Sequence, residues 1–442
     1  MRPTDALPHP EDWLTTTVGR SVELKRGVSW SKEQEHSEPG AGRVPVIGIR
    51  NVQDQLDLTD VLYLSALKPA AIDKTRVSAG WTVMVGSNGN RARIGNAVLI
   101  REDAAFLFAS FLIGAKPTAD SGLSSDYFYR WLSCEQVQAY LSASSEGTTG
   151  LSNLSHSFFR AMSIPIPPSD EQTAIARILD AVDTALERTR AAVERARELK
   201  DAVLNRFVYQ ALGETAYADR PRRRLPNGWE LVATAALLAD EPKNGVSPPA
   251  SSQPPGTPTF SIGAIRDGVV DLASDTNLKY AAISEPKARR FLVRSGDVLI
   301  VRGNANPDLV GKAAVVSSFP EGCIYPDIAK RVVFHQSQCP RILPAFAVHI
   351  WNHATVHNQV LRRAKTSNGT LKINNRDVKQ IVLPVPPDDE QKTLVEILSA
   401  AEAQLHALKN VAAAQQQLKK SLMHDLLTGR VRVRGTSEVT AP

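Results

Sequence analysis

The sequence has 442 residues, of which 43% are hydrophobic and 22% charged, and a formal net charge of +6. A chain of this length predicts at least two domains, because single hydrophobic cores rarely grow beyond about 300 residues. It holds no run of about 18 apolar residues and no signal-peptide core at its start, so we expect a cytoplasmic protein without a membrane segment. The positive charge permits a polyanionic partner without requiring one.

Residues 1–165 predict a first mixed α/β domain. The segment Gly86–Arg93 is rich in glycine, asparagine and arginine, which predicts an exposed loop between two strands. A stripe of apolar residues predicts one helix over 124–141. The predicted strands, the first of which can also be a short amphipathic element, cover 15–24, 44–49, 77–85 and 97–100.

Residues 166–213 predict a single long helix. Pro167 and Pro168 disfavour an earlier start, and Ser169 or Asp170 can cap the first turn. Apolar residues then recur at alternating steps of four and three residues, which is the heptad pattern of a coiled coil. A helix of roughly 60 Å with such a seam needs another helix along its length.

The second half of the chain repeats the first. Trp229 follows Trp13 by 216 residues, and Lys243-Asn-Gly-Val-Ser247 repeats the pattern of Lys25-Arg-Gly-Val-Ser29. We therefore expect a tandem duplication in which each globular domain is followed by a long helix. The predicted boundaries are 1–165 and 225–384 for the domains, 166–213 and 385–429 for the helices, 214–224 for a basic linker and 430–442 for a tail.

The two long helices begin with the same motif, which consists of Pro167, Pro168, Glu171 and Gln172 in the first copy and Pro386, Pro387, Glu390 and Gln391 in the second. Capping and packing explain these acidic residues better than acid/base catalysis does. One lysine interrupts each seam, Lys200 in the first and Lys419 in the second. Two explanations stay open: the lysines extend toward solvent, or they mark a stutter.

No catalytic site is predicted. A nucleotide-binding GxxxxGK[ST] loop is absent from the sequence. Asn304–Leu309 superficially resembles the loop that holds a flipped adenine in methyltransferases, but it lacks the second proline and the aromatic residue. Pro326–Lys330 resembles a nuclease Asp…Lys pair, but the second carboxylate is missing, and we interpret this segment as a turn at a strand edge.

No metal site is predicted either. His349, His353 and His357 have helical spacing, but Trp351 and Val356 around them indicate an ordinary helix face. The cysteines, at positions 134, 323 and 339, form neither a CxxC pair nor a Cys/His metal pattern. They fit a reducing compartment.

The order of domains and helix-start motifs resembles the specificity subunit of type I restriction–modification systems. Supporting segments are Leu225-Pro-Asn-Gly-Trp229, Ser295-Gly-Asp-Val-Leu299, Arg302-Gly-Asn-Ala-Asn-Pro307 and Leu426-Leu-Thr-Gly-Arg-Val431. The resemblance covers nearly the whole chain. The first domain departs from the family pattern at Gly80-Trp-Thr82, where Gly-Asp-Val is usual.

The resemblance implies an α+β fold with two mixed α/β target-recognition domains in tandem, each followed by a long helix, and the helices pairing as an antiparallel coiled coil with pseudo-twofold symmetry. It also implies a non-catalytic subunit that reads an asymmetric, bipartite site in double-stranded DNA. The implied partners are two methyltransferase subunits and two restriction/translocase subunits. No cofactor is expected in this chain, and S-adenosylmethionine, ATP and Mg are expected in the partner subunits.

Basic and amide residues on loops are the candidates for DNA contact. Arginine can bind guanine and asparagine can bind adenine in the major groove, whereas lysine mostly holds phosphate. The candidates are Lys25, Arg26, Asn90, Arg91 and Arg93 in the first domain and Lys243, Asn244, Arg302, Asn304 and Asn306 in the second. Two alternatives remain open: a self-contained methyltransferase or nuclease with an atypical site, and a coiled-coil scaffold that binds proteins only.

Overall fold

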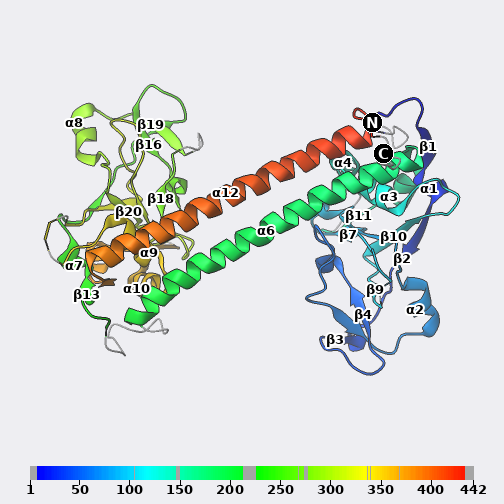
Figure 1. Cartoon of the computed structure of the whole chain (residues 1–442), viewed down its shortest axis with the longest axis horizontal. Helices are drawn as coiled ribbons and strands as arrows, with labels where there is room; N and C mark the ends of the chain where they lie inside the picture. Colours follow the sequence, from blue (N-terminus) through cyan, green and yellow to red (C-terminus); the bar gives the residue numbers. More distant parts are fainter. Residues whose placement is uncertain are drawn as a thin grey trace, which may run out of the picture. The chain divides into compact units, whose positions relative to one another are not determined.

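The computed structural model describes residues 7–103, 105–145, 150–212, 225–266, 268–272, 277–335, 337–338, 340–367 and 369–433. The predicted linker 214–224, most of the predicted tail and Cys339 lie outside the described residues. The chain divides into two compact units, which are Met1–Arg190 with Asn410–Pro442, and Ala191–Lys409. Each long helix contributes residues to both units (Figure 1).

In the first unit, two four-stranded sheets have the orders β2-β10-β6-β8 and β3-β5-β4-β9, and β1 pairs with β12 and β7 with β11. The strands are β1 (Leu14–Thr17), β2 (Val22–Arg26), β3 (Glu35–His36), β4 (Val44–Ile47), β5 (Leu62–Leu64), β6 (Thr82–Val85), β7 (Ser87–Asn88), β8 (Ala97–Leu99), β9 (Leu107–Phe108), β10 (Leu112–Pro117), β11 (Ser152–Asn153) and β12 (Ser163–Ile166). The short helices are α1 (Val18–Ser21), α2 (Pro69–Thr75), α3 (Ser125–Leu132), α4 (Glu135–Ala143) and α5 (His156–Ala161).

In the second unit, a six-stranded sheet has the order β14-β23-β20-β22-β18-β17, while β13 pairs with β26, β15-β19-β16 form one small sheet and β21-β25-β24 another. The strands are β13 (Glu230–Ala233), β14 (Lys243–Asn244), β15 (Ala250–Ser251), β16 (Thr257–Phe260), β17 (Ile265–Arg266), β18 (Val269–Val270), β19 (Leu278–Ala281), β20 (Val298–Val301), β21 (Gly303–Asn304), β22 (Ala313–Val315), β23 (Ala329–Val332), β24 (Lys365–Ser367), β25 (Thr370–Lys372) and β26 (Val382–Val385). The short helices are α7 (Thr234–Leu237), α8 (Glu285–Ala288), α9 (Pro344–Asn352), α10 (Ala354–Arg363) and α11 (Asn375–Lys379).

The strand pairings show the duplication directly. The β1–β12 pair corresponds to β13–β26, the β2-β10-β6-β8 sheet corresponds to β14-β23-β20-β22, and the β7–β11 pair corresponds to β21–β25. Each domain therefore closes by joining its first strand to the strand that precedes its long helix.

The long helices are α6 (Ser169–Leu212) and α12 (Asp388–Leu427). In each unit the first turns of one helix and the last turns of the other join the core. The first unit buries Leu179 of α6 beside Leu427 of α12, and the second buries Leu398 of α12 beside Val208 of α6. The two helices therefore run antiparallel within each unit (Figure 1).

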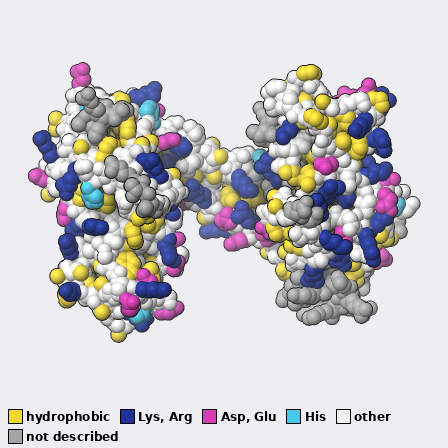
Figure 2. Space-filling model, turned by 180° about the vertical axis from the view of Figure 1, so that it is seen from behind, with side chains coloured by type: hydrophobic (Ala, Val, Ile, Leu, Met, Phe, Trp, Pro, Cys, Tyr) yellow, Lys and Arg dark blue, Asp and Glu magenta, His cyan; other side chains and the backbone are white. Residues whose placement is uncertain are grey.

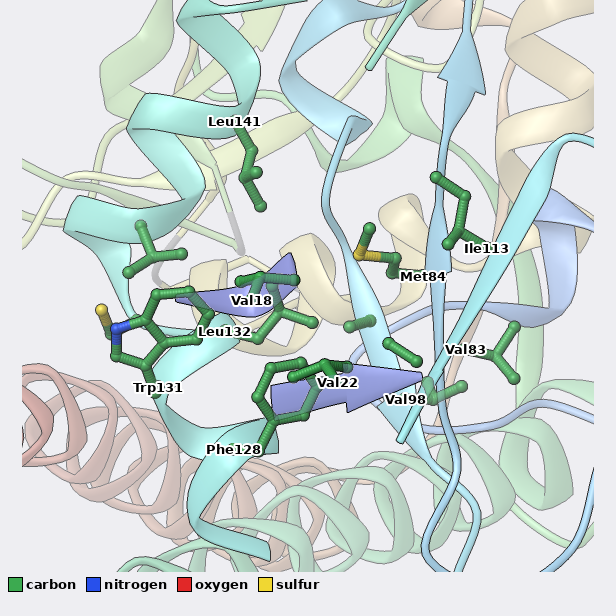
Figure 3. Packing of buried hydrophobic residues seen from close by; sticks show 14 of the residues in the cluster. Val18, Val22, Val83, Met84, Val98, Ile113, Phe128, Trp131, Leu132 and Leu141 are labelled. Atoms are coloured by element: carbon green, nitrogen blue, oxygen red, sulfur yellow. The ribbon is translucent and has the colours of Figure 1, made fainter. Parts of the chain in front are cut away.

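The core of the first unit packs its helices against its sheet. Phe128, Trp131 and Leu132 on α3 are buried in one cluster with Val18 and Val22, and Figure 3 shows these side chains directed toward one another. Each large apolar side chain removed from water in this way contributes about 1.5–3 kcal/mol to folding. The core fixes α3 against the strands that carry the candidate loops.

Two sequence predictions, one of a helix and one of a strand or short amphipathic element, were wrong in detail. The single helix predicted over 124–141 is two helices, α3 and α4, separated at Ser133 and Cys134. Cys134 is extended and buried at the corner, and the Gln138 amide donates to the Leu132 carbonyl at 2.7 Å, which satisfies an end of α3. The predicted element over 15–24 is likewise divided into β1, α1 and β2.

Candidate nucleic-acid interface

The helix-start motif joins each long helix to its own domain. In the first copy the Gln172 side chain accepts from the Ser124 amide at 2.8 Å and donates to the Gly122 carbonyl at 2.7 Å. In the second copy the Gln391 side chain bonds the backbone of Leu343 and Arg341 in the same way, at 2.8 and 2.9 Å. The glutamine thus links the helix start to the segment that leads into α3 or α9.

The glutamate of the motif binds the tryptophan that opens each domain. The Trp13 indole donates to Glu171 at 3.2 Å, and the Trp229 indole donates to Glu390 at 2.9 Å. Glu171 is buried because Arg432 also donates to it, at 2.8 Å, whereas Glu390 is exposed. These contacts give the motif a structural role at the base of each domain.

The repeated Lys-x-Gly-Val-Ser segments place four candidate residues on edge strands. Lys25 and Arg26 end β2, and Lys243 and Asn244 form β14; each strand is at the end of its sheet. A free strand edge exposes side chains and backbone groups to a partner.

The glycine that follows is required by close backbone packing. A Cβ atom on Gly27 would lie 2.1 Å from the Ala109 carbonyl oxygen, and one on Gly245 would lie 2.2 Å from the Tyr325 carbonyl oxygen. Real Cβ atoms do not approach this closely. The glycines therefore let the edge strand turn at the same place in both units.

The first domain's departure at Trp81 changes a side-chain contact and preserves the turn. Gly80 and Gly296 have φ values of +84° and +85°, and their N–H groups donate to the carbonyls of Ile100, just after β8, and Val316, just after β22, at 2.8 and 2.9 Å. The Trp81 ring lies 4.2 Å from the Lys25 ammonium, a cation–π distance. The equivalent Asp297 instead accepts from Arg331 at 2.6 Å.

The asparagine-rich loops have the same conformation in both units. The backbone N–H of Asn90 donates to the Asn88 side-chain oxygen at 2.7 Å, and the backbone N–H of Asn306 donates to the Asn304 side-chain oxygen at 2.9 Å. The side-chain oxygens of Asn90 and Asn306 in turn accept from the amides two residues on, at 3.1 and 2.9 Å. These Asx turns use the side-chain oxygens and leave the Nδ2 donors outside the turn.

Arg91 and Arg93 are held against backbone carbonyls of their own unit. The Arg91 guanidinium donates to the carbonyls of Ser142 and Ala143 at 2.8 and 2.9 Å, at the end of α4. The Arg93 guanidinium donates to the Val52 carbonyl at 2.6 Å. Both side chains thereby anchor the loop that carries Asn90.

Arg302 precedes β21 and is held by its backbone. Its N–H donates to the Ile328 carbonyl and its carbonyl accepts from the Ile373 N–H, both at 2.9 Å. Its side chain is half-buried and its charge acts on the neighbouring Lys330 ammonium. Arg302 therefore lies between β20 and β21, and its backbone bonds the residue before β23 and the residue after β25.

Sequence reasoning missed several basic residues of the second unit. Lys330 was assigned to a turn, but it lies on β23 and is buried. Residues 362–379 form the end of α10, the β24–β25 hairpin and α11, beside Asn304, which pairs with Leu371. Their basic residues are Arg362, Arg363, Lys365, Lys372, Arg376 and Lys379. Figure 2 shows Lys and Arg side chains spread over the visible face of this unit, the right-hand one in that view, among acidic and hydrophobic side chains.

The histidine trio does not share one helix. His353 lies between α9 and α10, where its ring accepts from the Thr355 amide at 3.2 Å and contacts Asn205 at 2.7 Å. His357 bonds the Val310 carbonyl at 2.6 Å, and His349 lies 3.6 Å from Glu402. Burial lowers the pKa of all three imidazoles. Among the described residues, no group of three or more His, Cys, Asp or Glu is placed to hold a metal ion.

Membrane-spanning character is also absent from the described helices, none of which is both long and apolar enough to cross a bilayer. The long helices α6 and α12 exceed the required length, but charged side chains recur along both of them.

Comparisons with known proteins agree with this arrangement. Residues 10–195 match the family model described as the type I restriction modification DNA specificity domain. The chain is 23% identical to the EcoKI specificity subunit of Escherichia coli K12 and 23% identical to the StySPI specificity subunit of Salmonella potsdam. Each alignment covers 97% of this chain and 91% of the relative.

A solved structure confirms the predicted fold class. The S subunit of a type I restriction–modification system from M. genitalium superposes with a TM-score of 0.59 at 15% identity, covering 96% of this chain and 99% of that chain. At this identity the match supports the fold alone. The chain is thus similar over nearly its whole length to specificity subunits of type I restriction enzymes, and residues 10–195 are similar to their DNA specificity domain.

Proposed function

We propose that this chain is a type I restriction–modification specificity subunit that reads an asymmetric, bipartite DNA site, one half through residues 1–165 and the other through residues 225–384, with no catalytic activity of its own. It assembles in this proposal with two methyltransferase and two restriction/translocase subunits in the cytoplasm. S-adenosylmethionine, ATP and Mg are supplied through those partners.

One observation carries this proposal: the two units repeat the same frame with different side chains on it. The close-packed glycine and the Asx turns recur. At the matched edge-strand position the first unit has Arg26 and the second has Asn244. Hydrogen-bonding groups of different kinds on one frame recognise different base pairs, so the two half-sites are expected to differ.

The contacts within each unit divide the candidates other than Lys25, whose ammonium lies over the Trp81 ring, into two groups. Arg26, Lys243 and Asn244 are exposed on edge strands, and Asn90 and Asn306 have exposed positions on their loops. We assign these residues, with Arg302 and Asn304, to the DNA-contacting face. Arg91 and Arg93 are assigned to holding the first loop, because carbonyl groups of the same unit already engage their guanidinium groups.

The antiparallel helices supply the proposed spacer. Each long helix begins at its own domain through the Glu-Gln motif and ends in the other unit's core. A continuous helix has a fixed rise of about 1.5 Å per residue. The length of the helix pair is therefore expected to fix the gap between half-sites, as dimer geometry fixes half-site spacing in other DNA-binding proteins.

The test is a genome-wide map of modified adenines in cells with and without this gene, combined with a domain exchange. Replacing residues 1–165 with the first domain of another family member is expected to change one half-site and keep the other. Inserting one heptad into both long helices is expected to lengthen the gap and keep both half-sites.

Three results contradict the proposal. Unchanged spacing after the heptad insertion removes the spacer role. Methylation or cleavage by the isolated chain supports the self-contained enzyme instead. Equal weak affinity for all duplexes in the assembled complex, with only a salt dependence, supports the scaffold alternative.

A further inference from the structure

A buried lysine lies on the strand next to the edge strand of the second unit. Lys330 lies on β23 between Ile300 of β20 and Asn244 of β14, and only 2% of its surface is exposed. In the first unit the residue that pairs with the matched Arg26 is Ile113. Burying a lysine where the first unit has a core isoleucine costs desolvation free energy. The lysine ammonium therefore needs hydrogen bonds that offset this cost, or a function that explains it.

The Lys330 ammonium is bonded to two asparagine side chains. Its Nζ lies 2.6 Å from the Asn244 Oδ1 and 2.6 Å from the Asn375 Oδ1. The Asn375 Nδ2 donates onward to the Pro242 carbonyl at 2.8 Å. Lys330 is thus the centre of a small hydrogen-bond network on the strand next to β14.

This network fixes which way the Asn244 amide faces. An ammonium group has three donors and no acceptor, so the atom of each amide that faces it must be oxygen. The orientation of Asn244 therefore follows from chemistry. With Oδ1 bonded to Lys330, the group that Asn244 offers outward from its exposed position is the Nδ2 donor.

We propose that Lys330 is a positioning residue that makes Asn244 a donor-only reader of a base acceptor in the second half-site. This inference rests on the proposed DNA-contacting face and deepens it. Asparagine recognises adenine through its oxygen and nitrogen together, but here the oxygen is directed toward the buried Lys330 ammonium. Asn244 is therefore matched to acceptors of the major groove, which are guanine N7 and O6, adenine N7 and thymine O4, and mismatched to the cytosine amino group.

The first unit presents a different donor group at the matched position. Its matched residue is Arg26, whose guanidinium has donors only. Arg26 needs no lysine behind it to fix its polarity, and its strand partner is the apolar Ile113. The two copies therefore differ at both positions together: Arg26 pairs with Ile113, and Asn244 pairs with Lys330. Such a joint difference is expected if the two residues of each pair recognise a base together.

The charge state of Lys330 is consistent with this role. Burial lowers its pKa to about 8, with the Arg302 charge adding to the effect and Asp377 opposing it. At neutral pH the ammonium form, which orients both amides, is still the major one.

The test uses the full chain assembled with its methyltransferase subunits, and a duplex library randomised over both half-sites. Asn244→Asp keeps a bond to Lys330 and turns an acceptor outward. It is expected to shift the preference at one base pair of the second half-site toward cytosine or the adenine amino group, by about tenfold or more. Lys330→Met releases the amide and is expected to weaken discrimination at that same base pair.

Lys372→Met is the matched control, because Lys372 is an exposed lysine on β25 of the same unit. Its loss is expected to weaken binding evenly across sequences. Thermal unfolding identifies folding defects in Lys330→Met, and Asn244→Asp then decides the question without removing the lysine.

The outcomes separate the two proposals. An unchanged base preference in Asn244→Asp, with both half-sites still recognised, overturns this inference and leaves the bipartite reader intact. A library that shows no bipartite preference even with the unsubstituted chain overturns the proposed function itself.

Discussion

The ammonium of Lys419 on α12 lies 2.7 Å from the carboxylate of Asp183 on α6. In the second unit Lys200 on α6 lies 2.9 Å from Glu402 on α12. Both the lysines and the acids are 219 residues apart in the sequence. The lysines that interrupt the seams therefore neither extend freely into solvent nor mark a stutter, since each pairs with the opposite helix within a continuous helix.

A third residue ties each pair to its globular domain. In the first unit Arg130 on α3, whose side chain is 3% exposed, binds Asp183 at 2.5 Å. In the second unit the residue 219 positions later is His349 on α9, at 3.6 Å from Glu402. Burial lowers the pKa of His349, although Glu402 opposes the shift, so the first cluster has two permanent cations and the second has one.

This difference predicts unequal costs when the acids are neutralised. Asp183→Asn removes the carboxylate that binds Lys419 and leaves the buried Arg130 with Asp180 alone, and it is expected to lower the free energy of unfolding by about 3 kcal/mol. Glu402→Gln removes one fully charged pair and is expected to cost about 1 kcal/mol. Denaturant unfolding of the full chain measures both.

The control is Asp54→Asn, since Asp54 pairs with Arg190 at 2.9 Å but its side chain is 79% exposed. Its loss is expected to change the free energy of unfolding by less than about 0.5 kcal/mol. Equal losses for the Asp183 and Asp54 variants would refute the role of the cluster.

Lys330 predicts a pH dependence of stability on the alkaline side. Its pKa falls from 10.5 to about 8 on folding, because burial disfavours the charged form. Between these values the unfolded chain binds more protons than the folded chain, so folding becomes more favourable as the pH rises. The unfavourable contribution of the buried Lys330 ammonium to the free energy of folding is complete below pH 8 and decreases toward pH 10.5.

The comparison that isolates this effect is with Lys330→Met, which has no titrating group. From pH 7.5 to pH 10 the unsubstituted chain is expected to gain stability relative to Lys330→Met by up to about 3 kcal/mol. Urea unfolding at several pH values measures the difference. A constant difference over this range would show that Lys330 titrates normally.

The long helices and the duplication were predictable from the sequence, because local residue patterns specify them. The long helices follow from the proline-rich starts and the heptad seam, and the duplication follows from constant offsets between matched residues. The break between α3 and α4 was not predictable in this way, because Ser133-Cys134 contains neither glycine nor proline.

The candidate site was less predictable, because its side chains act through distant partners. Arg91 was chosen as a loop arginine, but the carbonyls that engage it are 51 and 52 residues away in the chain. Lys330 was passed over because a lysine near an aspartate suggests a surface turn, whereas strand pairing places it behind Asn244. Such roles depend on tertiary contacts that spacing alone does not encode.

The edge-strand glycine predicts a loss confined to one half-site. Gly27→Ala places a Cβ 2.1 Å from a backbone oxygen, which neither side can avoid without moving the strand edge. Recognition of the first half-site is expected to fall at least tenfold, with the second unaffected, and the unfolding free energy is expected to fall by about 1–3 kcal/mol.

Gly48→Ala is the matched control in the same unit, since the only neighbour of its added Cβ is 3.9 Å away and its φ is −117°. Selection from a randomised duplex library measures how well each variant recognises the two half-sites. Equal behaviour of the two alanine variants would contradict the close-packing argument.

Arg91 and Arg26 are expected to respond differently to truncation, because one anchors a loop and the other faces outward. Arg91→Ala removes donors from the carbonyls that end α4 and is expected to lower the free energy of unfolding by about 2 kcal/mol. Arg26→Ala, at an exposed edge position, is expected to leave stability within about 0.5 kcal/mol and to relax base preference in the first half-site. Thermal unfolding together with half-site selection distinguishes the two roles, and a stable Arg91→Ala protein with altered base preference would make Arg91 a reader.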